Sequence, residues 1–261
     1  LLLLAENQQG LHNLIRLVSK ANTDGFYYKP RIDHELLSRH SEGLIGGSAC
    51  LAGEIPSFLL QGDERSALER IHLYRDILGK DNFFLEVMYN SIPEQAIVNK
   101  SLIKLARENS FPLIATNDAH YLEKEDYEWH DILLCVQTNS TVNEQDRMSF
   151  KTNDFYLRTP EEMWRIFGKE IPGALTNTLE IAERCNVAIT LNSGEYMLPE
   201  IDLPEGETLD SKLYKDARSG LEERLCTHSI PSIYLERLEY EIKVIQEMGF
   251  SGYFLIVSNI I

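Results

Sequence analysis

The sequence lacks the signatures of several large protein classes. Its opening apolar run, residues 1–4, stops at Ala5, which is too short for a signal sequence or a membrane span. There is no GxxxxGK[ST] and no GxGxxG after a predicted strand, which excludes the common nucleotide-binding loops. No GxSxG nucleophile elbow occurs either. The four cysteines lie far apart and form no CxxC pair, so we expect reduced thiols in a cytoplasmic protein rather than a disulfide framework.

Positive charge is also scarce. The chain has 25 Lys and Arg against 41 Asp and Glu, which gives a formal net charge of -16. Nucleic-acid affinity depends mainly on Lys and Arg side chains that neutralise phosphates. Because no basic patch stands out along the sequence, the composition argues against a broad phosphate-binding face. It is compatible with a divalent-cation enzyme or with docking to basic partners.

What is present is typical of a soluble globular protein. The 261 residues are 43% hydrophobic and 25% charged, enough for one large domain or two ordinary ones. The chain begins with leucine and ends inside an apolar run. We therefore expect it to be a piece of a longer protein.

Strand and helix patterns alternate through the first half of the chain. Predicted strands cover 1–5, 43–50, 83–89 and 113–116, and predicted helices between them cover 13–21, 67–78 and 94–109. Such alternation with short connections predicts parallel strands with crossover helices, and hence an α/β barrel or a doubly wound sheet. After about residue 138 the alternation is lost, and residues 192–208 have the Gly, Pro, Glu and Asp content of a linker. A helical pattern then covers 209–248, with a break at 229–232.

The best candidates for chemistry are Asp118 and His120, directly after a predicted strand. In parallel α/β folds, catalytic groups gather at the carboxyl ends of strands. Because residues i and i+2 of an extended chain point the same way, a carboxylate and an imidazole suited to Zn, Mn or Fe would project together. The commoner origin of a bare DxH pair is an aspartate that orients a turn beside a surface histidine.

Three further positions could support this site. Cys50 ends a second predicted strand among small residues, and its thiolate could be a metal ligand or a nucleophile, although most free cysteines are buried hydrophobes. Glu86 lies inside an apolar run, so it must be paired, ligated or directed toward the end of the strand. His130 begins a helix ten residues beyond His120. We predict that this helix buttresses the site.

Seven stretches of the chain, in order and well spaced, resemble the alpha subunits of bacterial DNA polymerase III. They are GFYYKPRID (25–33), SEGLIGGSACLAGEIP (41–56), FPLIATNDAHYL (111–122), HDILLCVQT (130–138), FYLRTPEEM (155–163), ALTNTLEIAERCNV (174–187) and MGFSGYFLIV (248–257). The resemblance covers essentially the whole chain. It spans the later part of the PHP domain (polymerase and histidinol phosphatase) and the segment that leads into the palm.

The resemblance implies an α/β fold, a partial PHP-type distorted (βα)7 barrel followed by a mostly helical connector. In this family a metal centre lies at the carboxyl ends of the barrel strands. The family's NDxH motif falls on residues 117–120, so Asp118 and His120 match its last two ligands, and Cys50 matches the cysteine of its SACL motif. The implied cofactor is a divalent metal, Zn, Mn or Fe. The implied division is 1–140 for the later PHP barrel, 141–208 for the end of that domain with a linker, and 209–261 for the connector into the palm.

Several family features are missing from these residues. The amino-terminal HxH motif and the ligands after it do not occur, so the metal site is incomplete, with Cys50, Asp118 and His120 as its only matched positions. No catalytic aspartate of the palm is matched. The parent enzyme is expected to be a Mg-dependent DNA-directed DNA polymerase, whereas this segment is expected to polymerise nothing.

The resemblance leaves the role of the PHP part open between two functions. One is metal-dependent phosphoesterase or 3′–5′ exonuclease activity, and the other is a structural role that docks a proofreading exonuclease. Expected partners are the remainder of the polymerase chain and, through the holoenzyme, the proofreading subunit and the sliding clamp. DNA is expected only through the parent enzyme, with no membrane contact and a cytoplasmic location. The alternative is a stand-alone PHP phosphoesterase of the histidinol-phosphatase type.

Overall fold

The computed structural model describes residues 1–189, 191, 199, 201–227 and 229–261. The chain divides into two compact units, Leu1–Ile189 and Thr190–Ile261, and each is described by itself. Much of the predicted linker, residues 192–198 and 200, lies outside the described residues.

The first unit is built on a four-stranded sheet in the order β1-β2-β3-β4. Its strands are β1 (Leu2–Ala5), β2 (Leu44–Gly47), β3 (Phe83–Met88) and β4 (Leu113–Thr116). β2, β3 and β4 are parallel, as the alternating pattern predicts, but β1 is antiparallel to β2. The prediction of parallel strands is therefore wrong for β1. Two helices, α1 (Gln8–Thr23) and α2 (His34–Arg39), connect β1 to β2 in place of the single crossover helix that joins parallel strands.

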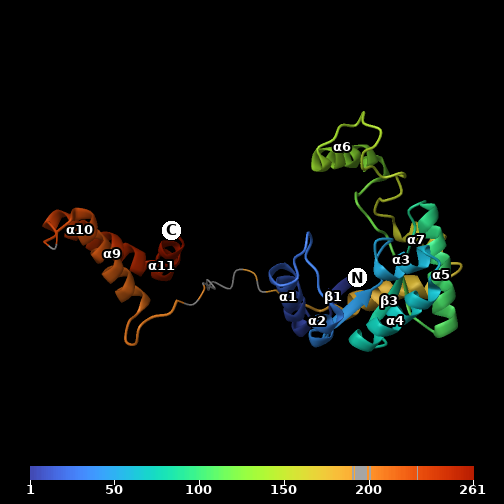
Figure 1. Ribbon diagram of the computed structural model, residues 1–261, viewed down its shortest axis with the longest axis horizontal. Helices are drawn as coiled ribbons and strands as arrows, with labels where there is room; N and C mark the ends of the chain where they lie inside the picture. The colour runs from blue at the N-terminus through green and yellow to red at the C-terminus, as the bar shows by residue number, and fades with distance from the viewer. Residues whose placement is uncertain (190, 192–198, 200, 228) are drawn as a thin grey trace. The chain divides into compact units, whose positions relative to one another are not determined.

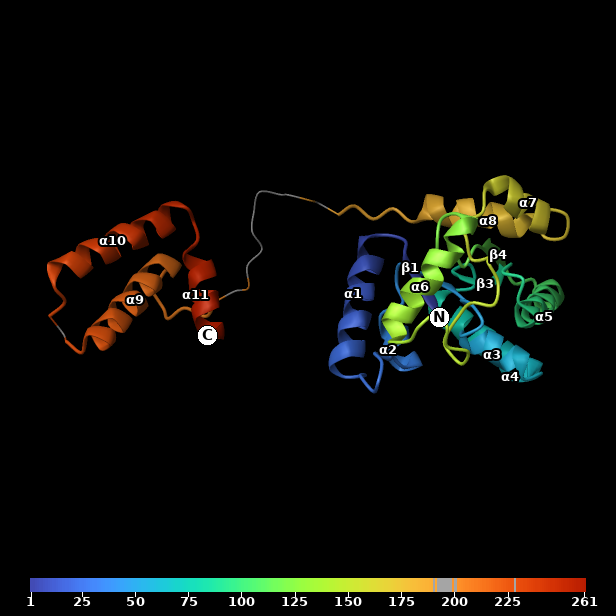
Figure 2. The ribbon, with the colours of Figure 1, turned by 90° about the horizontal axis from the view of Figure 1, so that it is seen from above.

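Helices cover both faces of this sheet. The larger core places Leu85, Val87 and other strand residues against α3 (Glu54–Leu60), α4 (Glu64–Leu78) and α5 (Pro93–Asn109). On the other face, Phe84 and Ile114 pack with Ile181 of α8 (Pro172–Arg184). Figure 2 shows the strands between α8 and the α3–α4 pair. Burial on both faces explains why β3 is an almost continuous apolar run. The mixed α/β class is confirmed, and the seven-unit barrel stays a prediction.

Helix ends follow local signals in the sequence. Pro93 occupies the first turn of α5, where its missing N–H costs no hydrogen bond, and Ser110 ends the helix in a left-handed conformation. α7 (Pro160–Phe167) begins with a capping box between Thr159 and Glu162. Pro160 then occupies the first turn of α7.

α6 (Tyr127–Thr138) follows β4 and the short 3-10 helix η1 (Lys124–Asp126). Figure 1 shows α6 set apart from the sheet and its covering helices. One side of α6 is buried at Leu134 and Cys135, whereas the exposed side carries large apolar residues, Trp129, Ile132, Leu133 and Val136. This unpartnered apolar stripe has the i, i+3, i+4, i+7 spacing of a packing face.

The second unit is helical where the structure describes it. It contains α9 (Leu209–Leu225), α10 (Ser232–Glu247) and α11 (Ser251–Ile260). Leu213, Ile242 and Leu255, one from each helix, form its buried core. The helical pattern predicted from residue 209 and its break before Ser232 are confirmed. None of the described helices combines the length and apolarity that crossing a membrane requires.

Candidate functional site

The loops after the three parallel strands share an unusual backbone. Ala49 after β2, Ser91 after β3 and Asp118 after β4 have φ values of 62°, 56° and 51°. Residues other than glycine seldom adopt this left-handed conformation, and such residues gather at functional sites. Because the carboxyl ends of parallel strands meet at one edge of the sheet, all three turns lie at that edge.

Asp118 and His120 come together at this edge. The distance between Asp118 Oδ1 and His120 Nε2 is 3.5 Å. The sequence predicts that an extended chain points both side chains the same way. That explanation is wrong, because β4 ends at Thr116 and the chain is not extended at Asp118. The left-handed turn at Asp118 brings the two side chains together instead. Their metal ligation stays a prediction.

Aromatic rings pack against one side of the His120 imidazole, whose side chain is 41% exposed. Its ring centroid lies 4.8 Å from that of Phe150, 5.5 Å from Phe155 and 5.8 Å from His130. The His120 backbone N–H also donates to the Phe155 carbonyl at 2.7 Å. These contacts hold one edge of the imidazole in an apolar environment while its Nε2 faces Asp118.

His130 lies on α6 and contacts His120 as the sequence predicts for a buttressing helix. Burial lowers the pKa of His130 below its ordinary value, and the neighbouring His120 lowers it further. Its Nδ1 is buried without a hydrogen-bond partner. A neutral His130 ring therefore packs beside His120 at neutral pH.

Cys50 follows β2 and is partly buried. Across the described ranges, no three His, Cys, Asp or Glu side chains are close enough together to hold a metal ion. The structure thus brings Asp118 and His120 together but does not join Cys50 to them. An imidazole and a carboxylate are suitable donors, but two are fewer than the protein ligands of ordinary zinc sites. Ligation by Cys50 stays a prediction.

Glu86 links the ends of the three parallel strands. Only 3% of the residue is exposed, and its carboxylate accepts hydrogen bonds from the Ala49 N–H at 3.0 Å and the Thr116 hydroxyl at 3.3 Å. Burial raises the pKa of Glu86, and the nearby Asp118 charge adds to the rise, whereas the two hydrogen bonds oppose it. A Cβ at Gly47 would lie 2.0 Å from Glu86 Oε1, so a larger residue there would displace the carboxylate. The sequence predicts that Glu86 is paired, ligated or directed toward the end of the strand, and the structure shows it paired through these hydrogen bonds.

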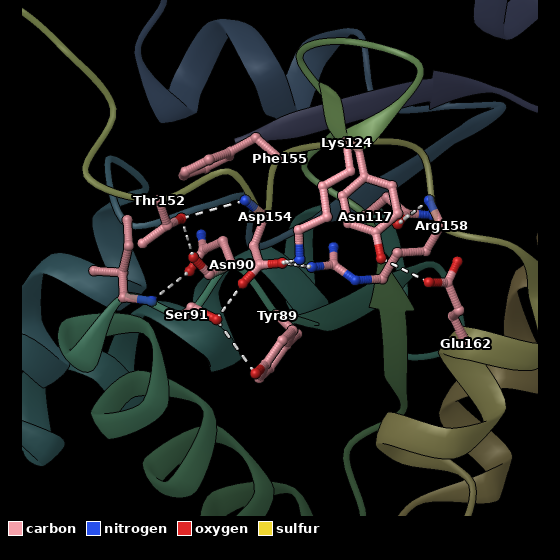
Figure 3. Close-up of polar contacts among 12 residues, drawn as sticks. Tyr89, Asn90, Ser91, Asn117, Lys124, Thr152, Asp154, Phe155, Arg158 and Glu162 are labelled. Carbon is pink, nitrogen blue, oxygen red and sulfur yellow. Dashed lines mark hydrogen bonds and ion pairs between the residues drawn. The ribbon is translucent and has the colours of Figure 1, made fainter. Parts of the chain in front are cut away.

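A polar cluster that the sequence did not predict lies beside the site, centred on Asp154 and Arg158 (Figure 3). Asp154 accepts hydrogen bonds from the Ser91 hydroxyl and from Lys124 Nζ, the latter at 3.1 Å. Arg158 Nη2 lies 3.2 Å from Asp154 Oδ1, and the Arg158 side chain is 2% exposed. Burial raises the pKa of Asp154, but Ser91, Lys124 and Arg158 outweigh it and hold that pKa below its ordinary value.

Two tyrosine rings flank the Arg158 guanidinium. Its Cζ lies 4.6 Å from the ring centroid of Tyr156 and 5.2 Å from that of Tyr89. The backbone N–H of Arg158 donates to the side-chain oxygen Oδ1 of Asn117 at 3.1 Å, and Asn117 directly precedes Asp118. The cluster therefore fixes the segment that carries Phe155 to the loops after β3 and β4. Its one signal in the sequence is an arginine that directly follows the run Phe155–Leu157.

Two family models match this chain. Residues 1–90 match the PHP domain, and residues 211–261 match the model described as the bacterial DNA polymerase III alpha NTPase domain. The two matches fall in different compact units of the structure.

Curated relatives match the chain along its whole length, and all of the following are named DNA polymerase III subunit alpha. The protein of Treponema pallidum is 42% identical over 262 residues, covering 100% of this chain and 22% of the relative. That of Aquifex aeolicus is 41% identical over 270 residues, covering 100% and 23%. That of Thermus aquaticus is 34% identical over 316 residues, covering 100% and 26%. The chain thus spans about a quarter of the length of the relatives it matches.

Proposed function

Because this chain is homologous along its whole length to part of the alpha subunit of bacterial DNA polymerase III, we propose that it serves template-directed DNA synthesis as part of such a subunit. The order of the two family matches, PHP first, supports this assignment over a stand-alone PHP phosphoesterase. The proposed partners are the remainder of the polymerase chain, the proofreading exonuclease and the sliding clamp, all in the cytoplasm. The catalytic aspartates and the Mg site of the polymerase are proposed to lie outside these residues.

For the PHP part we propose a metal-dependent phosphoesterase centre. The observation that carries this proposal is the 3.5 Å approach of Asp118 and His120 at the end of β4. These two residues would supply two ligands, and Cys50 a third. When bound, a Zn, Mn or Fe ion would lower the pKa of a water molecule and neutralise phosphate charge. Glu86 would hold the strand ends in register, and the Asp154–Arg158 cluster would hold Phe155 against His120.

Metal analysis of the full-length subunit tests this centre. We expect Asp118→Asn combined with His120→Ala to lower bound Zn or Mn several-fold, because the variant lacks two of the three proposed ligands. The measurement is elemental analysis after gel filtration. His12→Ala combined with Asp146→Asn is a matched control, since both residues are exposed. Equal metal in the site variant and the control would refute the assignment. We expect this chain alone to bind little metal.

A second role, as a docking platform for a protein partner, has its own supporting observation. α6 exposes Trp129, Leu133 and Val136, with exposed fractions of 65%, 65% and 75%. A stripe of this kind needs a partner surface to cover it. The same elemental analysis separates the two roles, because a full-length subunit without bound metal would favour docking over catalysis.

A further inference from the structure

Three consecutive aromatic residues are exposed in the turn between α1 and α2. Phe26, Tyr27 and Tyr28 have exposed fractions of 59%, 63% and 82%. Tyr28 has a φ of 58°, a conformation that a bulky residue seldom adopts. The guanidinium of Arg31 lies 4.8 Å from the ring centroid of Tyr27. We call residues 26–31 the aromatic turn.

The aromatic turn lies in a segment of this acidic chain where cations outnumber acids. Residues 16–40 contain five Lys and Arg against three Asp and Glu. The three acids are engaged: Asp33 caps α2, Asp24 pairs with Lys20 and Glu35 pairs with Arg39, so Lys29 and Arg31 are the cations of the turn itself. A pocket of about 650 Å³ beside the turn is lined by three cations, Lys20, Arg31 and Arg39, and by these three acids.

The topology brings the aromatic turn to the edge of the sheet that carries the candidate centre. β1 ends beside the beginning of β2, since Ala5 pairs with Leu44. α1 starts there and rises about 24 Å over its 16 residues, so the turn after it returns to the carboxyl edge of β2. His34, at the start of α2, lies 3.8 Å from Glu54, which begins α3 four residues after Cys50.

We propose that the aromatic turn is a binding surface for single-stranded polynucleotide on the sheet edge that carries the candidate centre. The inference rests on the proposed phosphoesterase function. Exposed aromatic rings stack with unpaired bases, and nearby Arg and Lys neutralise the phosphates between them. Tyr27 and Tyr28 supply the rings, and Lys29 and Arg31, both exposed, supply the charges. A duplex keeps its bases stacked on one another, so it cannot use the rings.

The expected affinity of the isolated surface is low. Only a few cations take part, and the rest of the chain is strongly acidic. A dissociation constant of roughly 100 µM at low salt is the scale of such sequence-independent contacts. This weakness agrees with the composition, which predicts DNA contact only through the parent enzyme. Within a full-length polymerase, a strand already held elsewhere would reach the surface at high effective concentration.

The test is fluorescence anisotropy of a labelled oligothymidylate titrated with the 261-residue chain. We expect Tyr27→Ala combined with Tyr28→Ala to weaken binding about tenfold or more, because each stacked base contributes on that scale. Arg31→Ala should lower the slope of log affinity against log salt by about 0.7. The matched control is Arg237→Ala combined with Tyr240→Ala, an exposed pair with the cation 5.8 Å from the ring, in the second unit. It should leave binding unchanged.

Three outcomes would overturn the proposal. They are equal loss in the control, equal affinity for a duplex of the same length, and no detectable binding at about 50 mM salt. Circular dichroism of each variant checks that the exposed substitutions leave the fold intact. Metal content is measured separately on the full-length subunit. A loss of metal without a loss of oligonucleotide binding, or the reverse, separates failure of the centre from failure of the surface.

Discussion

At the scale of single residues, the site contains contacts between residues that are close in the sequence and contacts between residues that are far apart in it. Asp118 and His120 are two positions apart, so a pattern in the sequence could identify them as a pair. Arg158 and Ser91 meet at Asp154, 4 and 63 positions away from it. No periodicity in the sequence reports a contact across 63 residues, which is why the sequence could predict the DxH pair but not the cluster that supports it.

Glu86 provides a prediction at this scale. Its ordinary pKa of 4.5 is raised in the folded protein by burial. Below pH 4.5 the carboxyl group is protonated in both states, and as pH rises the unfolded state ionises first, so the free energy of unfolding falls. Glu86→Gln should abolish this loss. The variant should gain stability relative to the wild type between about pH 4.5 and pH 8.

Urea denaturation at the two pH values measures the effect. The glutamine oxygen can still accept from the Ala49 N–H, and its amide can donate to the Thr116 hydroxyl. Glu94→Gln, at an exposed position in the first turn of α5, is the matched control. A difference between Glu86→Gln and wild type that does not change with pH would contradict the account.

At the scale of elements, local signals fixed most helices and strands, but not their directions. The predicted strand 113–116 coincides with β4, since its apolar run and the flanking turns are local. The direction of β1 could not be predicted because the six-residue helix α2 is too short to show a periodicity. With α2 in the connection, β1 runs antiparallel to β2, and the aromatic turn lies at the carboxyl edge of the parallel strands.

Arg158 gives the prediction for this scale, since it joins the loops after β3 and β4. Arg158→Met should destabilise the first unit by roughly 3 kcal/mol, the low end for a broken buried ion pair, because Lys124 still pairs with Asp154. Thermal denaturation measures the change. Arg65→Met removes an exposed i,i+4 pair with Glu69 and should cost far less. Comparable losses in the two variants would show that the buried cluster contributes no more than a surface pair.

At the scale of the whole molecule, the two units differ in the size of their cores. The first unit buries apolar residues on both faces of a sheet, whereas three buried residues form the core of the second. The net charge of -16 leaves no general excess of positive charge for the phosphates of a duplex. The aromatic turn would confine contact with a single strand to one edge.

This difference predicts two unfolding transitions. Both tryptophans, Trp129 and Trp164, belong to the first unit, so their fluorescence reports on that unit alone. Far-UV circular dichroism also reports the helices of the second unit. With the smaller core unfolding first, dichroism should begin to change at lower urea than fluorescence. Coincident curves would mean that the units unfold as one.

The contact between Gly47 and Glu86 also constrains how this sequence can change over evolutionary time. Any side chain at position 47 would occupy the space of the carboxylate that ties the strand ends together. A larger residue at position 47 therefore requires the Glu86 carboxylate to move, or a smaller residue at position 86. We therefore expect positions 47 and 86 to covary among related sequences, so that a replacement at one accompanies a compensating replacement at the other.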